Sequence, residues 1–366
     1  MIRMPWNNQS APNLVIELTD ACNIRCHACY KRRGNGCRPL EGIERDLDDA
    51  VGLRPLHTVT LSGGEPTLHP ELCRIVRMVH ERGLHVFLCT NGVRVDGELL
   101  RSLRAAGLDS ILFHVDTGQQ RPDLPAQPGF EDVRKRLDQL CAMAAEASLD
   151  VSFSAMLRGE DRDLLRQYTE YFLNAPDASF IFLSRSRDLT ALYACEPNPG
   201  GPPDMQRLAD VYREEFGIEP FAFVPANRGD EHVWVSYFVP VICNGTRRAL
   251  YRYRSNRMDV WTMQLVRLLT GRFIHKTVQN PRLTLFRMVL NAASGLHWGE
   301  LARFVRAWRR SGGQLRNKVI VYDDGPHHGP DGAVIRCEYC TTAIVRDGDM
   351  RPCCTADYHE QGEAPL

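Results

Sequence analysis

The sequence predicts an α/β fold built on a parallel sheet. Short apolar runs of strand length alternate with amphipathic patterns of helical period, and this pair recurs six times in the first 217 residues. A strand followed by a helix and a further strand makes a parallel sheet with right-handed crossovers. The predicted strands are 14–19, 58–62, 85–89, 110–115, 150–156 and 179–183. The predicted helices are 40–52, 71–82, 97–106, 131–147, 162–173 and 204–215.

The helix over 71–82 has the clearest pattern. Leu72, Ile75, Val76 and Val79 mark one face, and Gly83 follows as a C-terminal cap. The same periodicity places the other helices between their strands. The number of strand–helix units does not by itself distinguish an open sheet from a barrel.

The pattern changes after about residue 217. The segment 333–354 predicts a hairpin that turns at Asp347-Gly348, a dipeptide typical of a two-residue turn. We therefore expect three parts: the strand–helix part over 1–217, a basic and mainly helical extension over 218–330, and a hairpin over 331–366. The extension contains predicted strands at 231–243 and 318–322 and predicted helices at 258–270, 282–293 and 298–310.

Charge and composition narrow the class of protein. The 366 residues carry 45 Lys and Arg and 45 Asp and Glu, but from Glu231 to Arg316 fourteen Arg and one Lys face only three acids. Thirteen Cys in a chain of this length do not make the dense disulfide framework of a small secreted domain. The first residues lack the apolar core of a signal peptide, and no run reaches the roughly 18 apolar residues of a transmembrane helix. We therefore expect a reducing, cytoplasmic location.

Three cysteines follow the first predicted strand. Cys22, Cys26 and Cys29 form a C-x3-C-x2-C run in a polar loop. Three thiolates can hold three irons of a [4Fe–4S] cluster and leave the fourth iron open for another ligand. Structural zinc sites use four protein ligands, usually in Cys-x2-Cys pairs, so the triplet fits zinc poorly. The triplet therefore predicts an iron–sulfur cluster with one open iron.

A second motif, Ser62-Gly63-Gly64-Glu65-Pro66-Thr67, follows the next strand. Together with the cysteine triplet it resembles the radical S-adenosylmethionine (SAM) superfamily, over roughly residues 14–190. The resemblance implies a partial (β/α)6 barrel with a mixed helical and β-hairpin C-terminal extension. It also implies that the amino and carboxylate groups of SAM bind the open iron. Gly63 and Gly64 would then approach this ligand closely, and Glu65 would pair with the SAM ammonium.

Further cofactor-binding residues are expected at the ends of the other strands. In similar proteins an aromatic residue lies beside the adenine, and Tyr30 occupies that place; simple packing is the alternative. Asn91 ends the third strand. Asp116 follows the fourth strand and can accept hydrogen bonds from the ribose hydroxyls or cap a helix. Ser154 and Arg158 end the fifth strand, where Arg158 can bind the SAM carboxylate or form a surface ion pair.

Four more cysteines, Cys337, Cys340, Cys353 and Cys354, lie near the C-terminus. The predicted hairpin brings the two pairs together around Gly348. The spacing resembles the auxiliary-cluster extensions of the twitch and SPASM types on many radical SAM enzymes, which implies one further [4Fe–4S] cluster. Zinc is the alternative, because a Cys-x2-Cys pair beside a second thiol pair is an ordinary zinc arrangement.

The fourth ligand of the auxiliary cluster is expected to be Cys354 or a remote thiol such as Cys243 or Cys195. Cys195 has a second candidate role, because it begins a Pro- and Gly-rich stretch at 195–207 that we expect to form a mobile loop above the barrel. A thiol there can return a hydrogen atom to a substrate radical. A bystander role is the alternative.

The basic segment has two interpretations. Arginine stems can cover apolar surface while the helices pack on the barrel. Basic amphipathic helices also bind anionic lipid headgroups, which would give a peripheral membrane location, and a phosphate-bearing substrate is another anionic partner. No RNA-binding motif accompanies the basic residues, so we expect no nucleic-acid partner.

These observations predict a radical SAM oxidoreductase that abstracts hydrogen from a small, anionic or amphiphilic substrate, in an oxidation or an epimerisation. The auxiliary cluster would take an electron, and an external donor such as flavodoxin or ferredoxin would reduce the first cluster. Peptide modification is an alternative, although only about thirteen residues precede the first strand and no leader-peptide-binding domain is expected there. A cluster- or zinc-bearing binding or regulatory protein is a third hypothesis, which the intact cysteine triplet and Glu65 argue against.

Overall fold

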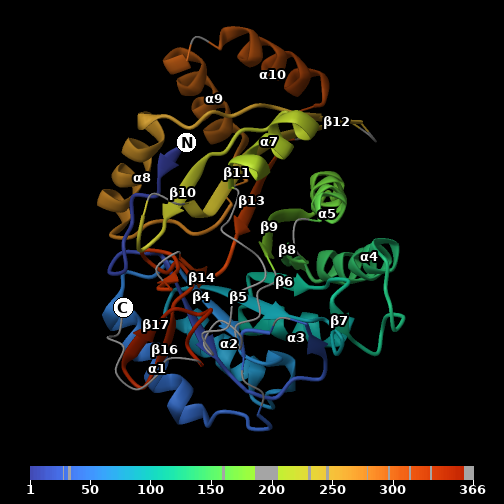
Figure 1. Cartoon of the computed structure of the whole chain (residues 1–366), viewed down its shortest axis with the longest axis vertical. Coiled ribbons are helices and arrows are strands. Elements are labelled where there is room, and N and C mark those ends of the chain that lie inside the picture. Colours follow the sequence, from blue (N-terminus) through green and yellow to red (C-terminus); the bar gives the residue numbers. More distant parts are fainter. Residues whose placement is uncertain are drawn as a thin grey trace.

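The computed structural model describes residues 1–27, 29–31, 34–158, 161–185, 205–229, 232–244, 247–277, 279–295, 297–312, 315–329 and 332–357. Six parallel strands lie side by side in chain order at the centre of one large sheet (Figure 1). The six are β2 (Asn13–Glu17), β4 (Thr58–Ser62), β5 (His85–Thr90), β6 (Ser110–His114), β8 (Asp150–Leu157) and β9 (Ala178–Arg185). The predicted α/β class and parallel sheet are confirmed.

A helix follows each of these strands and lies close to its predicted position. Their bounds are α1 (Leu40–Leu53), α2 (Leu72–Glu81), α3 (Gly97–Ala106), α4 (Phe130–Glu146), α5 (Arg162–Asn174) and α7 (Met205–Phe216). The four apolar residues of the predicted α2 face are all buried. Asp96 and Asp161 cap α3 and α5, because each carboxylate accepts a hydrogen bond from a backbone N–H in the first turn.

The two faces of the parallel strands have different compositions, because successive side chains point to opposite faces. Large apolar side chains on the outer face pack against the helices in the main core. On the inner face, small hydroxyl residues occur at many positions. The helix-covered side is therefore filled, and the inner side is not. The outer-face residues include Leu14, Ile16, Val59, Leu61, Val86, Leu88, Ile111, Phe113, Ile181 and Leu183.

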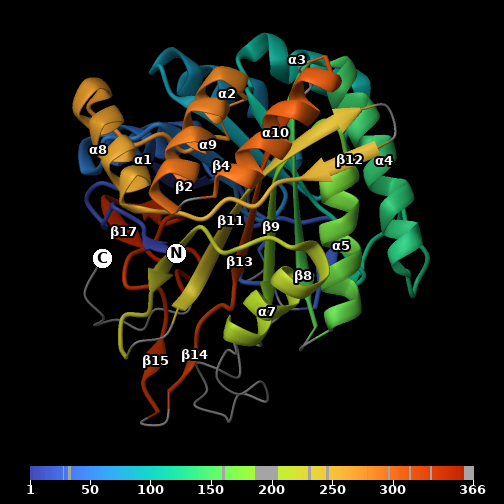
Figure 2. The ribbon, with the colours of Figure 1, turned by 90° about the horizontal axis from the view of Figure 1, so that it is seen from above.

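The central strands form a partial barrel, because further strands extend the sheet beyond both β2 and β9. β13 (Leu315–Asp323) pairs parallel to β9, and β11 (His232–Asn244) pairs antiparallel to β13, as Figure 2 shows. β10 (Ala222–Pro225) and β1 (Ile2–Arg3) continue the sheet, and β12 (Arg247–Leu250) pairs with β11. The sheet therefore runs across residues 217 and 218, and the three-part division of the chain stays a prediction.

Buried Lys318 fastens the extension to the barrel. Its Nζ donates hydrogen bonds to the carbonyl oxygens of Phe172, Ala175 and Ala178 at 2.6–2.8 Å, where α5 ends and β9 begins. A helix C-terminus presents unpaired carbonyls that a cation stabilises. This lysine therefore couples β13 to the last helix and strand of the barrel.

The extension also contains α8 (Arg257–Thr270), α9 (Pro281–Gly295) and α10 (Trp298–Arg310). These helices enclose a second core with the N-terminal segment, in which Trp6, Phe238, Phe273 and Phe304 are buried. The extension therefore packs on the barrel through its own core. Within the described ranges, no helix combines the length and apolarity needed to cross a bilayer.

The C-terminal hairpin is confirmed at its predicted turn. β16 (Ile344–Arg346) and β17 (Asp349–Arg351) are joined by Asp347 and Gly348, which have φ values of 53° and 81°. Positive φ at both turn positions matches the twist of antiparallel strands. β16 also pairs parallel to β2, through Ile344 and Val15, so the hairpin lies against the edge of the barrel.

A buried ion network joins this hairpin to the cysteine loop. Lys31 Nζ lies 3.1 Å from Glu17, 3.0 Å from Asp20 and 3.0 Å from Asp357. Arg346 pairs with the same two carboxylates, Glu17 and Asp357. Glu17 is 1% exposed and Lys31 5% exposed. Charges this deeply buried need partners, so these contacts fix β2, the loop and the hairpin relative to one another.

Lys31→Met should destabilise the protein by about 3–5 kcal/mol, because it removes one of the two cations that neutralise the buried Glu17 and Asp357 carboxylates. The free energy of unfolding from urea titration measures this loss. Lys135→Met is the matched control: Lys135 is 65% exposed and 4.0 Å from Glu131, so its loss should cost at most about 0.5 kcal/mol. Equal effects of the two substitutions would contradict the role of the network.

Candidate active site

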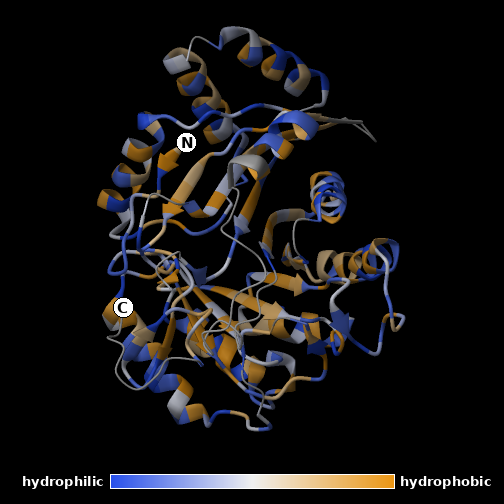
Figure 3. Cartoon of the chain, in the orientation of Figure 1, coloured by the Kyte–Doolittle hydropathy of each residue, from blue (hydrophilic) through white to orange (hydrophobic). Residues whose placement is uncertain are grey.

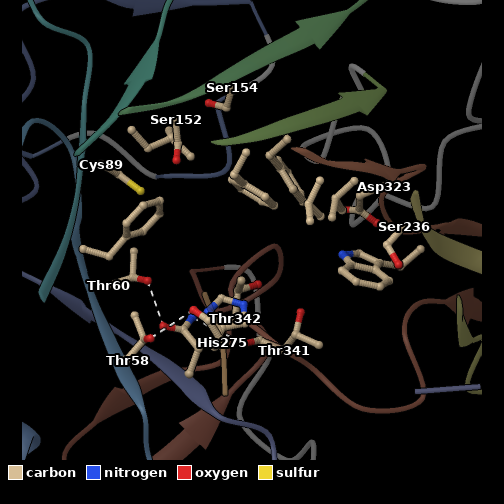
Figure 4. Close-up of a pocket in the computed structure, with 18 of the residues that line it drawn as sticks. Thr58, Thr60, Cys89, Ser152, Ser154, Ser236, His275, Asp323, Thr341 and Thr342 are labelled. Atoms are coloured by element: carbon tan, nitrogen blue, oxygen red, sulfur yellow. Dashed lines mark hydrogen bonds between the residues drawn. The ribbon is translucent and has the colours of Figure 1, made fainter. Parts of the chain in front are cut away.

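A cavity of about 660 Å³ lies on the inner side of the sheet. Hydroxyl side chains from several strands point into it (Figure 4). This volume is within the range of small-molecule sites. The inward residues include Thr58, Thr60, Cys89, Ser152, Ser154 and Ser236, together with the aromatic residues Phe87, Phe180, Phe182 and Trp234.

The first cysteine set lies in the loop after β2. β3 (Arg25–Cys26) in this loop pairs with β7 (Gln119–Gln120), and the His27 N–H donates to the Gly118 carbonyl at 3.2 Å. The three thiols are partly exposed and part of the cavity lining. Three soft ligands on one wall fit the expected cluster with an open iron.

Gly63 and Gly64 lie against the cysteine loop. A Cβ on Gly63 would come within 2.5 Å of the Thr19 carbonyl oxygen, and one on Gly64 would overlap the Ala21 carbonyl. The Gly64 N–H donates to the Thr19 carbonyl at 2.6 Å, and the Glu65 N–H donates to the Ala21 carbonyl at 2.8 Å. Because Gly63 and Gly64 lack side chains, the loop after β4 can meet the cysteine loop. This need for glycine is separate from the expected close approach of SAM.

The carboxylate of Glu65 is buried and accepts four hydrogen bonds. Oε1 accepts from Thr67 N–H and Oγ1 and from Thr90 Oγ1, at 2.6–3.0 Å, and Oε2 accepts from the Asn91 N–H at 2.7 Å. Glu65 also caps the short 3₁₀ helix η1 (Pro66–Leu68). This carboxylate ties the ends of β4 and β5 together, while its pairing with the SAM ammonium stays a prediction.

Asn91 links the end of β5 to the cysteine loop. Its Nδ2 lies 2.8 Å from Asn23 Oδ1 and 3.9 Å from Cys22 Sγ. The side chain therefore supports the loop and points an N–H toward a thiol of the first set. Hydrogen bonds to sulfur ligands are one way in which a protein tunes a cluster.

Tyr30 lies between the two cysteine sets. Its hydroxyl is 3.3 Å from Ser62 Oγ, and its ring, like the Cys353 side chain, packs against a small cluster of Val15, Ile344 and Ala356. Burial raises the pKa of Tyr30 well above the ordinary value, and the nearby Cys353 and Cys29 thiols add to the shift. At this position of the cavity wall, a neutral tyrosine can pack against the protein or contact a ligand.

At the end of β6, His114 rather than Asp116 faces the cavity. The Asp116 carboxylate accepts hydrogen bonds from the backbone N–H groups of Gly118 and Met156, at 2.8 and 3.1 Å. His114 lies 3.5 Å from Asp116 and 2.7 Å from the hydroxyl of Ser154, which also lines the cavity. Residues 110, 112 and 114 are the inward positions of β6, but the strand ends at His114. Asp116 lies beyond the strand, where backbone N–H groups rather than the cavity take up its carboxylate.

Two further expected site residues do not reach the described cavity. Arg158 is exposed and is absent from the cavity wall, so its expected contact with the SAM carboxylate has no support here. Cys243 packs against the main core and is also absent from the wall. Cys195 and most of the expected loop at 195–207 lie outside the described residues.

The four C-terminal thiols line the cavity together. Burial raises the pKa values of Cys337, Cys353 and Cys354 well above the ordinary thiol value, and the neighbouring Cys340 thiol adds to each shift. All four thus belong to one part of the cavity wall. Buried thiols are the donor chemistry that a cluster or zinc uses.

The N-terminal segment holds the Cys337–Cys340 turn in place. Tyr339 donates to the Met4 carbonyl at 3.0 Å, and the Cys340 N–H donates to Asn8 Oδ1 at 3.0 Å. Buried Arg54 donates to the Cys340 carbonyl at 3.2 Å.

Among the described side chains, no three or more His, Cys, Asp or Glu are close enough to share a single metal ion.

The cavity wall contains imidazoles at the amino ends of the strands, which the sequence analysis did not single out. His85 and His275 belong to the wall, and His57 lies 5.8 Å from His85 in a stacked arrangement. Burial lowers the pKa of both His57 and His275 to about 4, and neighbouring imidazoles add to the effect. The inward parity of His85 on β5 is the sequence signal that finds it.

Gly64→Ala should prevent stable iron incorporation, because the new methyl group drives the cysteine loop away from its place. Iron and sulfide content after anaerobic reconstitution is the measurement. Gly52→Ala is the matched control, since a Cβ there meets nothing within 4 Å. Full iron incorporation in Gly64→Ala would contradict the need for this contact.

Stability should fall as the pH is lowered from about 6.5 toward 4. The folded pKa of about 4 at His57 and His275 lies below the ordinary 6.5, so the unfolded state binds more protons in this window. Above about pH 6.5, both imidazoles are neutral in the folded and in the unfolded state, so they do not make the stability depend on pH. Urea titrations at several pH values measure the effect, and the double variant His57→Asn/His275→Gln should have a shallower slope. An unchanged slope would show that these imidazoles do not cause it.

Comparison with known proteins gives the family. Residues 16–171 match the family model described as the radical SAM superfamily. The GTP 3',8-cyclase of Chlorobaculum tepidum is 31% identical over 243 residues, which cover 58% of this chain and 68% of the cyclase. The tungsten-containing aldehyde ferredoxin oxidoreductase cofactor-modifying protein of Pyrococcus furiosus is 35% identical over 107 residues, 28% of this chain and 30% of that protein.

Among solved structures, Streptococcus suis SuiB bound to the precursor peptide SuiA is similar with 15% identity and a TM-score of 0.44. The match covers 57% of this chain and 46% of SuiB. The chain thus spans less than half the length of SuiB and of the Pyrococcus protein. Because the cyclase match exceeds 30% identity over two thirds of that enzyme, and the family model covers the parallel strands up to β8, the chain belongs to the radical SAM superfamily.

Proposed function

We propose that the protein is a radical SAM oxidoreductase that acts on a small, anionic or amphiphilic substrate held in the 660 Å³ cavity. The observation that carries this proposal is that both cysteine sets and the Gly63–Glu65 loop line one cavity. A substrate in that cavity would lie within reach of both sets. Oxidation and epimerisation are the two outcomes compatible with this arrangement.

Cys22, Cys26 and Cys29 would hold the first [4Fe–4S] cluster. With the cluster reduced, bound SAM would supply the chemistry for hydrogen abstraction from an unactivated C–H bond. The chain's own part is to position and protect. Gly63 and Gly64 keep the cysteine loop against β4, and Glu65 keeps the ends of β4 and β5 together.

The inner face would bind and orient the substrate. Aromatic side chains of β5, β9 and β11 give the cavity apolar walls that exclude water. Hydroxyls of Thr58, Thr60 and Ser152 and the imidazole of His85 offer hydrogen bonds at separate points along it. Apolar walls with a few polar groups suit an amphiphile better than a uniformly polar molecule.

Cys337, Cys340, Cys353 and Cys354 would hold the auxiliary cluster. Support for Cys354 as the fourth ligand comes from its place on the cavity wall with the other three thiols, whereas Cys243 packs against the core. The raised thiol pKa values mean that a bound cation must replace these protons. An auxiliary cluster here would accept the electron released by a substrate oxidation, and zinc would serve only as a structural clip.

The iron content separates these alternatives. After anaerobic reconstitution the protein should hold about eight irons, four in each cluster. Cys337→Ala/Cys353→Ala should hold about four and still form 5'-deoxyadenosine with a reductant such as flavodoxin or ferredoxin. Replacing Cys22, Cys26 and Cys29 together by Ala should abolish that product. Cys141→Ala, a packing thiol outside the cavity wall, is the control and should retain both clusters.

Two results would contradict the proposal. SAM cleavage by the triple variant would remove the first cluster from its place in the mechanism. One zinc and only about four irons in the unmodified protein would leave no auxiliary electron acceptor. Transfer of deuterium from a labelled candidate substrate into 5'-deoxyadenosine would identify the substrate, and a deuterated peptide as the donor would favour peptide modification instead.

A further inference from the structure

Exposed apolar side chains are concentrated on the helices of the extension. Nine of the twelve large apolar residues that are exposed in the described part of the chain lie between positions 258 and 298. Leu268 is 82% exposed, Leu269 75% and Trp261 71%. Soluble surfaces rarely gather such residues in one region without a partner. The nine are Met258, Trp261, Leu265, Leu268, Leu269, Leu283, Phe286, Val289 and Trp298.

Along α8 these residues form an outward stripe. Met258, Trp261, Leu265 and Leu268 follow one another at three- and four-residue spacing, which places them on one side of the helix. Met263 and Val266 lie on the other side and line the cavity. α8 is therefore apolar toward both the protein and the solvent. Figure 3 shows apolar and polar residues interleaved along α8 and α9 at the periphery of the molecule.

The charges around this stripe are positive. From Arg257 to Arg310 the chain has nine Arg and one Lys against two acids, Asp259 and Glu300. Asp259 is buried and pairs with Arg287 at 3.1 Å, and Glu300 pairs with Arg303. The acids of these helices are thus already neutralised.

Several exposed Arg and Lys side chains of these helices, and of the segment between α8 and α9, have no acidic partner among the described residues. Within the described residues, no acidic group lies within ion-pair distance of these side chains. The exposed set is Arg257, Lys276, Arg282, Arg306, Arg309 and Arg310. The surface therefore offers net positive charge beside exposed indole and leucine side chains.

The cavity reaches the same surface. Leu283 of α9 and Lys276, in the segment between α8 and α9, are both exposed and both part of the cavity wall. Thr262, Met263 and Val266 of α8 line the cavity from the other helix. The cavity wall thus shares Lys276 and Leu283 with the exposed surface of the extension.

We infer that the exposed surface of α8, α9, α10 and the segment between α8 and α9, defined by the nine apolar residues and six cations above, docks on an anionic phospholipid bilayer. Leucine and tryptophan side chains would enter the boundary between headgroups and acyl chains, and the cations would contact anionic headgroups. A second copy of the chain fits this face less well, because a symmetric contact would bring like charges together.

The docking surface goes beyond the proposed function. Only its consequence for the substrate rests on that function: an amphiphile from the bilayer would enter the cavity beside Lys276 and Leu283. Each exposed cation near an anionic surface and each inserted apolar side chain adds to binding, so the interaction should depend on both salt and lipid charge.

Co-sedimentation of the reconstituted full-length protein with vesicles tests the inference. The protein should bind phosphatidylcholine vesicles that contain phosphatidylglycerol, and added salt should release it. Leu268→Glu/Leu269→Glu should lower partitioning about tenfold or more. Arg257→Glu/Arg282→Glu should lower it by a comparable factor without loss of helix, since acids suit the first helical turn. Val51→Glu, at a 47% exposed apolar position of α1, is the matched control and should bind like the unmodified protein.

The outcomes are distinct. No binding to anionic vesicles, equal binding to neutral vesicles, or equal losses in Val51→Glu and the α8 variant would each overturn the inference. A dimer in sedimentation analysis that Leu268→Glu/Leu269→Glu dissociates would assign the face to a second copy instead. Because vesicle binding is measured without SAM or reductant, its failure leaves the proposed radical chemistry untouched. Failure of SAM cleavage would in turn leave the docking result standing.

Discussion

The buried charge of Glu17 is the constraint on which the arrangement of the site depends. A carboxylate that is 1% exposed must be neutralised, and the two cations that do so come from different parts of the chain. Lys31 follows the first cysteine set, and Arg346 belongs to the C-terminal hairpin that precedes Cys353. Pairing both with the last residue of β2 fixes the two cysteine regions on one side of the sheet. The parallel contact of β16 with β2 strengthens the same connection through the backbone.

The chemistry proposed for this protein needs enclosed space, and the strands provide it through their alternation. Their outer residues make the packed core, while inner positions such as Thr60 and Ser152 are too small to fill the barrel. The open edge between β2 and β9 is flanked by β16 and β13, so the extension takes part in enclosing the cavity. The same extension carries the basic and apolar surface of α8, α9 and α10. The extension and the C-terminal hairpin together therefore contribute the auxiliary thiols, part of the cavity wall and the proposed docking surface.

Several residues of the Gly63–Glu65 motif also hold the scaffold together. Gly64 lacks a Cβ because a backbone carbonyl of the cysteine loop occupies that space. Glu65 holds three neighbouring residues through its carboxylate, so a substitution there would disturb the scaffold as well as any bound ligand. Effects on SAM binding at such positions need a separate measure of stability before they are assigned to direct contact.

The sequence by itself determined the local features: the order and type of the strands and helices, the turn at Asp347-Gly348, and the two motifs that identify the family. These follow from periodicity and spacing along the chain, which neighbouring residues encode. Only the tertiary structure decided which polar groups face the cavity. His114 faces it and Asp116 does not, because β6 ends at His114 and the backbone N–H groups of Gly118 and Met156 bind the Asp116 carboxylate. Likewise, only the fold shows that Cys354 lines the cavity with the other C-terminal thiols while Cys243 packs against the main core.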